Sequence, residues 1–412
     1  MGLPISIPII KPVDAFCNLN CSYCYAGIDG TGQALGRMNL QTLKQTIDFF
    51  CKNQGEEVEF IWHGGEPLLA GKAFYHRVVE LQRPWVIQGK KITNILQTNA
   101  TLVTQKWAHF LAERGFVVGT SLDGPQKLHD KFRKHKTGKG SYKKVVRGIN
   151  LLRNAGIFGG VICGVTVVNY ENPQKLLDFF VAEGIKKLKF MRIRTIGCCD
   201  NVHVPTLSAE QFTDFMIAIF DYWLELDDPE IEIRDIQSVV NVLLGGRVRE
   251  CVYMGRCEQF ATVYSDGSIR ACDSFPKSES THFGSVTEEH KTVRNNPNLK
   301  TFEHIIMERK KSCWGCSWYF MCQGGCMKDN YLNLGSRTPR KEVCRNLKRY
   351  FSHIRNRLEA YGLLTTGTAL TREEDEYECS HSGTEGSAQG KAGCGTRAEN
   401  VRQENSTGQE MG

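Results

Sequence analysis

Three cysteines near the start of the chain constrain its fold and chemistry more than any other feature. Cys17, Cys21 and Cys24 form a C-x3-C-x2-C run that follows a predicted strand over residues 7–13 and leads into a loop. Thiolates this close together can reach one metal centre, and soft sulfur ligands select iron–sulfur clusters or zinc. A structural zinc site takes a fourth protein ligand, whereas the next cysteine, Cys51, falls in a helical pattern. Three thiolates on a [4Fe–4S] cluster would leave one iron open to a small molecule, and buried core cysteines are the alternative.

An aromatic residue, Tyr23, stands directly before the last cysteine of this run. With it, the run resembles the signature of the radical S-adenosylmethionine (SAM) superfamily. The resemblance implies that SAM chelates the open iron, and that electron transfer from the reduced cluster yields a 5′-deoxyadenosyl radical. The cofactor then supplies the chemistry, and the protein supplies its position and electronics. An electron donor such as flavodoxin or ferredoxin is therefore an expected partner.

The composition is that of an ordinary globular protein, with 41% hydrophobic and 24% charged residues over 412 positions. This length allows two domains with buried cores. No apolar run of about 18 residues predicts a transmembrane helix, and the N-terminus lacks the basic region of a secretory signal. We therefore expect a cytoplasmic protein with no membrane partner.

The formal net charge of +7 is moderate, and its densest basic stretch covers residues 131–144. A solvated loop and helix start is the preferred interpretation of this stretch, and weak attraction to an acidic peptide is the functional alternative. Nucleic acid is a distant third, and no nucleic-acid partner is expected. The basic residues are Lys131, Arg133, Lys134, Lys136, Lys139, Lys143 and Lys144.

Strand and helix signals alternate from about residue 5 to residue 235, which predicts βαβ units and a parallel sheet. Six such units predict an α/β fold, an open, partial (β/α)6 barrel, whose ligands collect at the carboxyl ends of the strands. The predicted strands cover residues 7–13, 58–63, 94–98, 116–122, 160–168 and 188–193. The predicted helices between them cover residues 40–52, 72–83, 104–114, 142–155 and 172–183.

The composition changes after the barrel. Residues 208–245 predict two helices joined by Asp-Asp-Pro, residues 251–344 predict short elements with glycine turns and cysteines, and residues 345–361 predict a helix. Beyond residue 364 the chain is rich in Gly, Ser, Thr and Glu, which is typical of disorder. We therefore divide the chain into a core barrel (1–235), a bridge and cysteine-rich domain (236–364) and a disordered tail (365–412).

Gly64-Gly65-Glu66-Pro67 follows the second predicted strand. Two glycines let the backbone approach a ligand closely, and a carboxylate at a strand end can pair with an ammonium group. The four residues resemble the GGEP motif of the superfamily, which implies a contact with the methionine amino group of SAM.

Further candidates for SAM binding end the third and fourth predicted strands. Ser121 and Asp123 follow the fourth strand, and the resemblance implies that the serine contacts the carboxylate or ribose of the cofactor. Asp123 is equally well explained as a cap of the following turn. Gln97 and Asn99 end the third strand and are weaker candidates.

Seventeen cysteines are many for such a chain, and without a signal peptide a disulfide framework is not expected. Eight of them lie between positions 251 and 344 in a spacing that resembles the SPASM domain, which implies two auxiliary [4Fe–4S] clusters and three clusters in all. By resemblance one auxiliary cluster is held by Cys251, Cys257, Cys272 and Cys326, and the other by Cys313, Cys316, Cys322 and Cys344. Two structural zinc sites are the rival. The predicted non-ligands are Cys51, Cys163, Cys198, Cys199, Cys379 and Cys394.

Asp273 directly follows Cys272. In anaerobic sulfatase maturases and related peptide-modifying enzymes, an aspartate at the matching position is thought to take a proton from the substrate. A carboxylate beside a cluster and away from bulk water suits a general base, and a turn aspartate is the alternative.

These features together predict a radical SAM enzyme with a SPASM domain that oxidises a side chain of a peptide or protein. Cross-linking of a ribosomally made peptide is the main hypothesis. Formation of formylglycine from a Cys or Ser of a sulfatase is the alternative within the enzymes. A zinc-binding scaffold without radical chemistry is the hypothesis from a different class.

Overall fold

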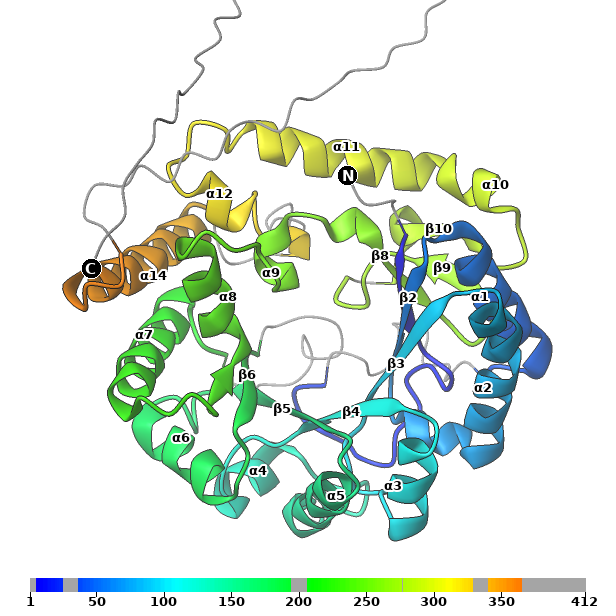
Figure 1. Ribbon diagram of the computed structural model, residues 1–412, viewed down its shortest axis with the longest axis horizontal. Coiled ribbons are helices and arrows are strands. Elements are labelled where there is room, and N and C mark those ends of the chain that lie inside the picture. The colour runs from blue at the N-terminus through cyan, green and yellow to red at the C-terminus, as the bar shows by residue number, and fades with distance from the viewer. Residues whose placement is uncertain (1–4, 25–35, 194–205, 276, 329–339, 365–412) are drawn as a thin grey trace, which may run out of the picture. The chain divides into compact units, whose positions relative to one another are not determined.

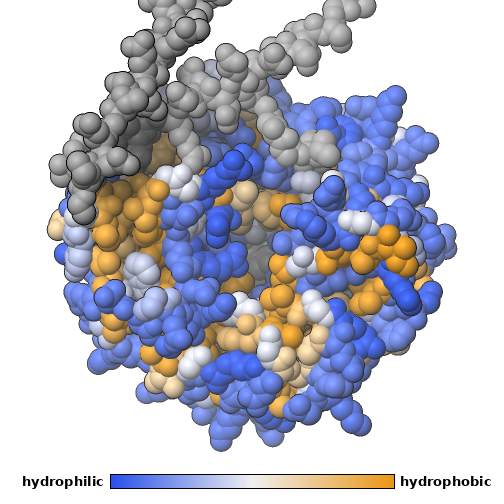
Figure 2. Space-filling model, viewed as in Figure 1, coloured by the Kyte–Doolittle hydropathy of each residue, from blue (hydrophilic) through white to orange (hydrophobic). Residues whose placement is uncertain are grey.

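A ring of parallel strands, with helices around its outside, forms the centre of the molecule (Figure 1). The structure, a computed structural model, describes residues 5–24, 36–193, 206–275, 277–328 and 340–364. These residues belong to one compact unit, residues 1–370. In space-filling form, the face turned to the viewer is hollowed at the centre of the ring (Figure 2). No helix of the described residues is both long and apolar enough to cross a membrane.

All ten strands lie in one sheet in the order β10-β9-β8-β1-β2-β3-β4-β5-β6-β7. Neighbours from β8 through β1 to β7 are parallel, while β9 is antiparallel to both β8 and β10. The strands are β1 (Ile7–Ile10), β2 (Glu57–Trp62), β3 (Lys91–Gln97), β4 (Phe116–Ser121), β5 (Phe158–Val165), β6 (Lys187–Arg192), β7 (Glu232–Ile233), β8 (Phe260–Val263), β9 (Ser268–Arg270) and β10 (His282–Ser285).

The helices that follow successive strands cover the outside of the ring, and α14 packs beside α7 and α8 (Figure 1). The first group is α1 (Leu40–Asn53), α2 (Lys72–Ile87), α3 (Gln105–Ala112), α4 (Gln126–Phe132), α5 (Tyr142–Asn154), α6 (Pro173–Ala182), α7 (Ala209–Leu226) and α8 (Arg234–Leu243). The second group is α9 (Cys251–Met254), α10 (His290–Arg294), α11 (Pro297–Lys311), α12 (Tyr319–Cys322) and α14 (Arg340–Ala360), with 3-10 turns at Pro67–Ala70, Cys257–Gln259 and Glu279–Thr281.

Alternation along each strand separates the core from the inside of the ring. On β4, Phe116 and Val118 are buried in the core beneath the helices, whereas Val117, on the opposite face, is 43% exposed. Because successive side chains of a strand point to opposite faces, the face that includes Val117 and Ser121 lines the inside of the ring. Residues at the ends of the strands on this face are therefore positioned around one common opening.

The predicted barrel is confirmed as an α/β fold with all six strands, whose ends differ from the predictions by a few residues. The first strand ends at Ile10 rather than at residue 13, because Pro12 has no N–H to donate. Helix α4, which ends as the basic stretch 131–144 begins, was not predicted. The expectation of short elements after residue 251 was wrong for α11, a 15-residue helix with Pro297 in its first turn and an Asn296 cap. The predicted tail lies outside the described residues, and the boundary at residue 235 stays a prediction.

Candidate active site

The loop after β1 carries Cys17, Cys21 and Cys24, all of them partly buried. A turn brings the N–H of Cys24 to the carbonyl of Cys21 at 3.0 Å. The N–H of Leu19 donates to the Cys17 sulfur at 3.3 Å. Burial raises the pKa of Cys17 to about 11 and that of Cys21 to about 12. These thiols are therefore protonated in the free chain and would release protons on binding metal.

Gly64 and Gly65 bring the second motif directly against this loop. The N–H of Gly65 donates to the carbonyl of Asp14 at 2.7 Å, and the N–H of Glu66 donates to that of Phe16 at 2.9 Å. A Cβ on Gly65 would lie 2.1 Å from the Phe16 oxygen, and Gly64 has a φ of +113°. Both positions therefore require glycine, and the reason is close packing of backbone against the residues before Cys17.

Glu66 is fully buried and serves the chain itself. Its Oε1 accepts from the Thr98 hydroxyl at 2.7 Å and from the N–H of Leu68 at 3.0 Å, and its Oε2 accepts from the N–H of Asn99 at 2.8 Å. Burial raises the pKa of Glu66, and these hydrogen bonds oppose the rise. The carboxylate thus fixes the end of β3, and the contact of this motif with the methionine amino group of SAM stays a prediction. Pro67 begins the 3-10 turn that follows.

Asn99 joins the end of β3 to the cysteine loop. Its side-chain nitrogen, Nδ2, donates to Asn18 Oδ1 at 2.9 Å and lies 3.7 Å from the Cys17 sulfur. The side-chain amide of Gln97, the last residue of β3, donates to the Thr120 carbonyl at 3.0 Å and lies 3.4 Å from the Ser121 hydroxyl. The structure therefore places Gln97 and Ser121 together on the inside of the ring, and Asn99 beside the first cysteine.

Asp123 does not cap the following turn with its side chain. Its carboxylate accepts from the Tyr23 hydroxyl and, at 3.0 Å, from the N–H of Gly164. Arg133 donates to the same Tyr23 oxygen at 2.9 Å. Burial raises the pKa of Asp123, and the positive charge of Arg133 opposes that rise. The turn-cap alternative was wrong, because the carboxylate instead holds the aromatic residue of the cysteine run.

The cysteines of the C-terminal region fall into neighbouring groups. The pKa of Cys257 is raised by a hydrogen bond with Cys326 and by burial. The pKa of Cys272 is raised mainly by burial, and the charges of Cys326 and Cys251 raise it further. Burial raises the pKa of Cys251 to about 11, with a contribution from Cys326.

The second group follows the same pattern. Burial raises the pKa of Cys322 to about 11, with contributions from Cys344 and Cys313. Cys316 lies three residues from Cys313 in the same turn, where its N–H donates to the Cys313 carbonyl at 2.9 Å. Cys51 and Cys163 are buried in the core, while Cys198, Cys199, Cys379 and Cys394 lie outside the described residues.

Both groups of thiols, and the first three, have the donor chemistry of Fe–S ligands. Among the described residues, no three Cys, His or acidic side chains gather closely enough to hold one metal ion. Thiolates of a [4Fe–4S] cluster bind different irons, so they need not converge on a single point. The residues present therefore fit clusters, and the described geometry offers no compact ion site.

Asp273, after β9, meets two residues that the sequence analysis did not select. Its Oδ2 lies 2.9 Å from His63 Nδ1 and 3.8 Å from Lys11 Nζ. Lys11 also lies over the ring of Tyr264, 5.1 Å from its centroid. Burial lowers the pKa of Lys11, but the carboxylate of Asp273, followed by the Tyr264 hydroxyl, raises it above its usual value.

Lys11 and His63 carried a signal that could have been read. Each stands directly after a core residue that ends its strand, Ile10 of β1 or Trp62 of β2, so alternation predicts that it faces away from that core. A charged side chain that is only 6% exposed requires a buried counter-charge. The structure supplies Asp273, so that the buried Lys11 and Asp273 and the partly buried His63 form one cluster beside Cys272. This cluster has the chemistry to exchange a proton and is called the proton-handling group below.

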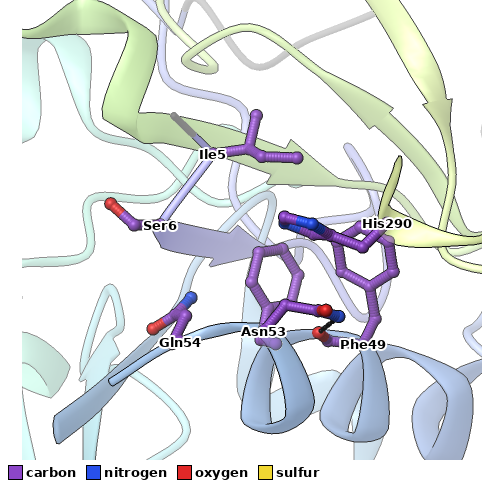
Figure 3. Close-up of a pocket in the computed structure, with 7 residues that line it drawn as sticks. Ile5, Ser6, Phe49, Asn53, Gln54 and His290 are labelled. Carbon is purple, nitrogen blue, oxygen red and sulfur yellow. Dashed lines mark hydrogen bonds between the residues drawn. The ribbon is translucent and has the colours of Figure 1, made fainter. Parts of the chain in front are cut away.

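A small hollow on the outer surface shows no such chemistry. It lies between the start of β1 and helix α1 and is lined by Ile5, Ser6, Phe49, Phe50, Asn53, Gln54 and His290 (Figure 3). The ring of His290 packs at 5.3 Å from that of Phe49, and Asn53 donates to the Phe49 carbonyl. The candidate site is therefore the opening of the ring.

Comparison with known proteins agrees with this chemistry. A family model of the radical SAM superfamily matches residues 13–180. A serine-type anaerobic sulfatase-maturating enzyme of Bacteroides thetaiotaomicron is 30% identical over 84% of this chain and 88% of its own length. A cysteine-type enzyme of Clostridium perfringens is 30% identical over 86% of this chain and 97% of its own.

Solved structures give the same result at the level of the fold. The structure of native anSMEcpe with bound AdoMet and the Cp18Cys peptide superposes with a TM-score of 0.76, at 28% identity, over 88% of this chain and 99% of that one. SuiB of Streptococcus suis, bound to its precursor peptide SuiA, superposes with a TM-score of 0.59 at 17% identity, which is a likeness of fold alone.

Proposed function

Because the chain belongs to the radical SAM superfamily, in the family of the anaerobic sulfatase-maturating enzymes, we propose that it converts a Cys or Ser side chain of a sulfatase to formylglycine. The observation that carries this proposal is the 30% identity to such enzymes over 84% of the chain. The relatives favour it over the cross-linking of a ribosomal peptide, which was the main hypothesis from the sequence. Family membership also argues against a zinc scaffold.

The first cluster would be held by Cys17, Cys21 and Cys24, and the auxiliary clusters by the two C-terminal groups of cysteines. When bound, SAM and the clusters supply the radical that removes a hydrogen atom and an acceptor for the second electron. Asn99 and the backbone around Gly65 fix the loop that carries the first ligands. Gln97 and Ser121, on the inside of the ring, are proposed to contact SAM.

Oxidation of a side-chain alcohol or thiol to the aldehyde level also releases a proton, and Asp273 is the proposed base. Its carboxylate is held by His63 Nδ1 at 2.9 Å and by Lys11 Nζ at 3.8 Å. These contacts fix its orientation and pair it with a positive charge. A positioned carboxylate of this kind contributes about a hundredfold or more to proton transfer.

The test begins with anaerobically prepared protein, whose iron and sulfide are measured; three clusters imply about twelve irons per chain. The protein is then reduced with SAM and incubated with matched peptides that carry Cys or Ser at a sulfatase maturation sequence. We expect 5′-deoxyadenosine and an aldehyde that reacts with hydrazide. A cross-linked peptide in place of the aldehyde would reject the proposal, and zinc without iron would reject the chemistry as a whole.

A variant separates the first cluster from the others. Replacing Cys17, Cys21 and Cys24 by Ala should abolish 5′-deoxyadenosine while about two thirds of the iron stays, because the auxiliary ligands are intact. The matched control replaces the core cysteines Cys51 and Cys163 by Ala, and it should keep the full iron content and form 5′-deoxyadenosine. Formation of 5′-deoxyadenosine by the triple variant would contradict the assignment of these ligands.

A further inference from the structure

The basic stretch identified in the sequence is built onto the cysteine loop. The N–H of Ser22 donates to the Phe132 carbonyl at 3.0 Å, and that of Asn20 donates to the Lys134 carbonyl at 2.8 Å. Leu19 and His135 form an antiparallel bridge. The segment then folds back on itself through a bridge between Lys134 and Gly140. It therefore forms a small hairpin whose edge pairs with the residues between Cys17 and Cys24.

Residues 127–144 concentrate the positive charge of the whole protein. They contain eight Lys and Arg against one acidic residue, Asp130, a net charge of +7 that equals the charge of the entire chain. The remaining sequence, with 44 basic and 44 acidic residues, is neutral. The carboxylate of Asp130 is taken by the N–H of Tyr142 at 2.9 Å. The charge of this segment is thus not balanced within it.

Most of this charge points to solvent. Six of the lysines are exposed, and no acidic side chain among the described residues forms an ion pair with any of them. Arg133 is different, because it turns inward to the Tyr23 hydroxyl. Unpaired surface charge of one sign attracts an oppositely charged partner and accelerates its association. The exposed lysines are Lys127, Lys131, Lys136, Lys139, Lys143 and Lys144.

An exposed aromatic ring adjoins the charges. Phe16, the residue before Cys17, is 40% exposed, and Lys136 Nζ lies 5.1 Å from the centre of its ring. Aromatic side chains surrounded by polar groups are typical anchors of protein–protein contacts. Residues 127–144 and Phe16 together are called the basic surface below.

We propose that the basic surface docks a small acidic electron-transfer protein of the flavodoxin or ferredoxin type, which reduces the first cluster. In this step one electron leaves the reduced carrier and one enters the cluster, and no proton or bond changes place. The inference rests on the radical SAM part of the proposed function and not on the identity of the protein substrate. A carrier on this surface would lie against the loop that contains Cys21 and Cys24.

An acidic stretch of the protein substrate is the other occupant of matching charge, and the position of the surface favours the carrier. The hairpin follows β4, whereas the proposed base Asp273 follows β9 and its partner His63 follows β2. In the sheet, β9 and β4 lie on opposite sides of β1 and β2. The basic surface is therefore joined to the cluster loop from the β4 side, whereas the proton-handling group lies at the ends of β1, β2 and β9.

The test compares two triple variants that change the net charge equally. The surface variant carries Lys136→Glu, Lys139→Glu and Lys143→Glu. The control carries Lys106→Glu, Lys175→Glu and Lys348→Glu, at exposed positions on α3, α6 and α14. Iron content is matched first. The initial rate of 5′-deoxyadenosine formation is then measured with a subsaturating acidic flavodoxin kept reduced by its reductase, and separately with dithionite.

With flavodoxin at low ionic strength, the surface variant should be about tenfold slower than the wild type, and the gap should shrink as salt is added. With dithionite it should match the wild type, and the control should stay within about twofold under both reductants. No sulfatase peptide is present, so failure to form formylglycine leaves this comparison intact.

Equal flavodoxin-driven rates in the surface variant and the control would overturn the proposal. A normal flavodoxin rate, together with a raised KM for the sulfatase peptide in a separate assay that contains it, would overturn the proposal and assign the surface to the substrate. If dithionite also fails in the triple variant, Lys139→Glu alone, at the exposed end of the hairpin, repeats the comparison. It is expected to be about two- to threefold slower with flavodoxin only, and an unchanged rate would again overturn the proposal.

Discussion

Replacing Asp273 by Asn should lower both the stability of the fold and the yield of product. Replacing Lys11 by Met in addition should restore the stability but not the product. Lys11 Nζ and Asp273 Oδ2 are 3.8 Å apart, and their side chains are 6% and 7% exposed. At an effective dielectric constant of about 20, opposite charges at this distance attract by about 4 kcal/mol. Removing one member of a buried pair costs about 3–5 kcal/mol, because the other charge stays buried without its partner.

The carboxylate of Asp14 also stabilises the charge on Lys11, so we expect the lower end of this range for Asp273→Asn, about 3 kcal/mol. For a folded unit of this size, that loss lowers the melting temperature by about 4 °C. Lys11→Met should cost less, since His63 Nδ1 still contacts the carboxylate at 2.9 Å. In the double variant both charges are gone, and the melting temperature should return to within about 1–2 °C of the wild type.

The assay is anaerobic calorimetry of the four proteins at equal iron content, paired with counts of 5′-deoxyadenosine and aldehyde. Asp273→Asn should still form 5′-deoxyadenosine but little aldehyde, both alone and together with Lys11→Met. If the double variant regains aldehyde as well as stability, Asp273 is a structural partner of Lys11 and not the base. If Asp273→Asn melts with the wild type, the buried ion pair does not stabilise the protein as argued.

Two further predictions concern other sites. Gly65→Ala should lose the iron of the first cluster and 5′-deoxyadenosine formation, because the added Cβ would lie 2.1 Å from the Phe16 oxygen. The control Gly55→Ala, whose Cβ would have nothing within 4 Å, should behave as wild type. A wild-type iron content in Gly65→Ala would contradict this packing. Burial raises the pKa of Asp235 from 3.8 to about 6, so the folded state loses stability as the pH rises through this interval. Asp235→Asn should therefore raise the free energy of unfolding by up to about 3 kcal/mol at pH 7.5 and by about half as much at pH 5; an equal gain at both pH values, measured by urea unfolding, would show that Asp235 does not titrate in this way.

The parts of the site that the sequence predicted are those in which local spacing carries the chemistry. The cysteine run and the Gly64–Pro67 turn are each contiguous, and the strand–helix alternation placed both at the carboxyl ends of neighbouring strands. His63 escaped selection because its partner, Asp273, is 210 residues away in the chain. Arg133 was assigned to a solvated stretch because composition does not show which way one side chain of a basic segment points.

The role of Glu66 and the choice of substrate show two different limits. Glu66 was expected to meet a ligand, since a carboxylate at a strand end is available for one. Three donors from its own chain also bind it, and only the folded arrangement reveals these contacts. The cysteine and glycine motifs resemble those of maturases that act on different peptides and proteins. They therefore predict radical chemistry, whereas the choice of substrate depends on the similarity to known enzymes.

The pairing of β1 with β8 has a consequence for how the chain reaches its fold. Residues Ile7–Ile10 bond in parallel with Phe260–Val263, so one edge of the first strand has no partner until some 250 residues more have been synthesised. Loop closure over such a distance is slow, and an unpaired strand edge is prone to associate with other chains. A nascent or truncated product that stops before residue 260 should therefore need a chaperone to stay dispersed. Anaerobic expression yields are expected to depend on that interval as well as on the supply of iron.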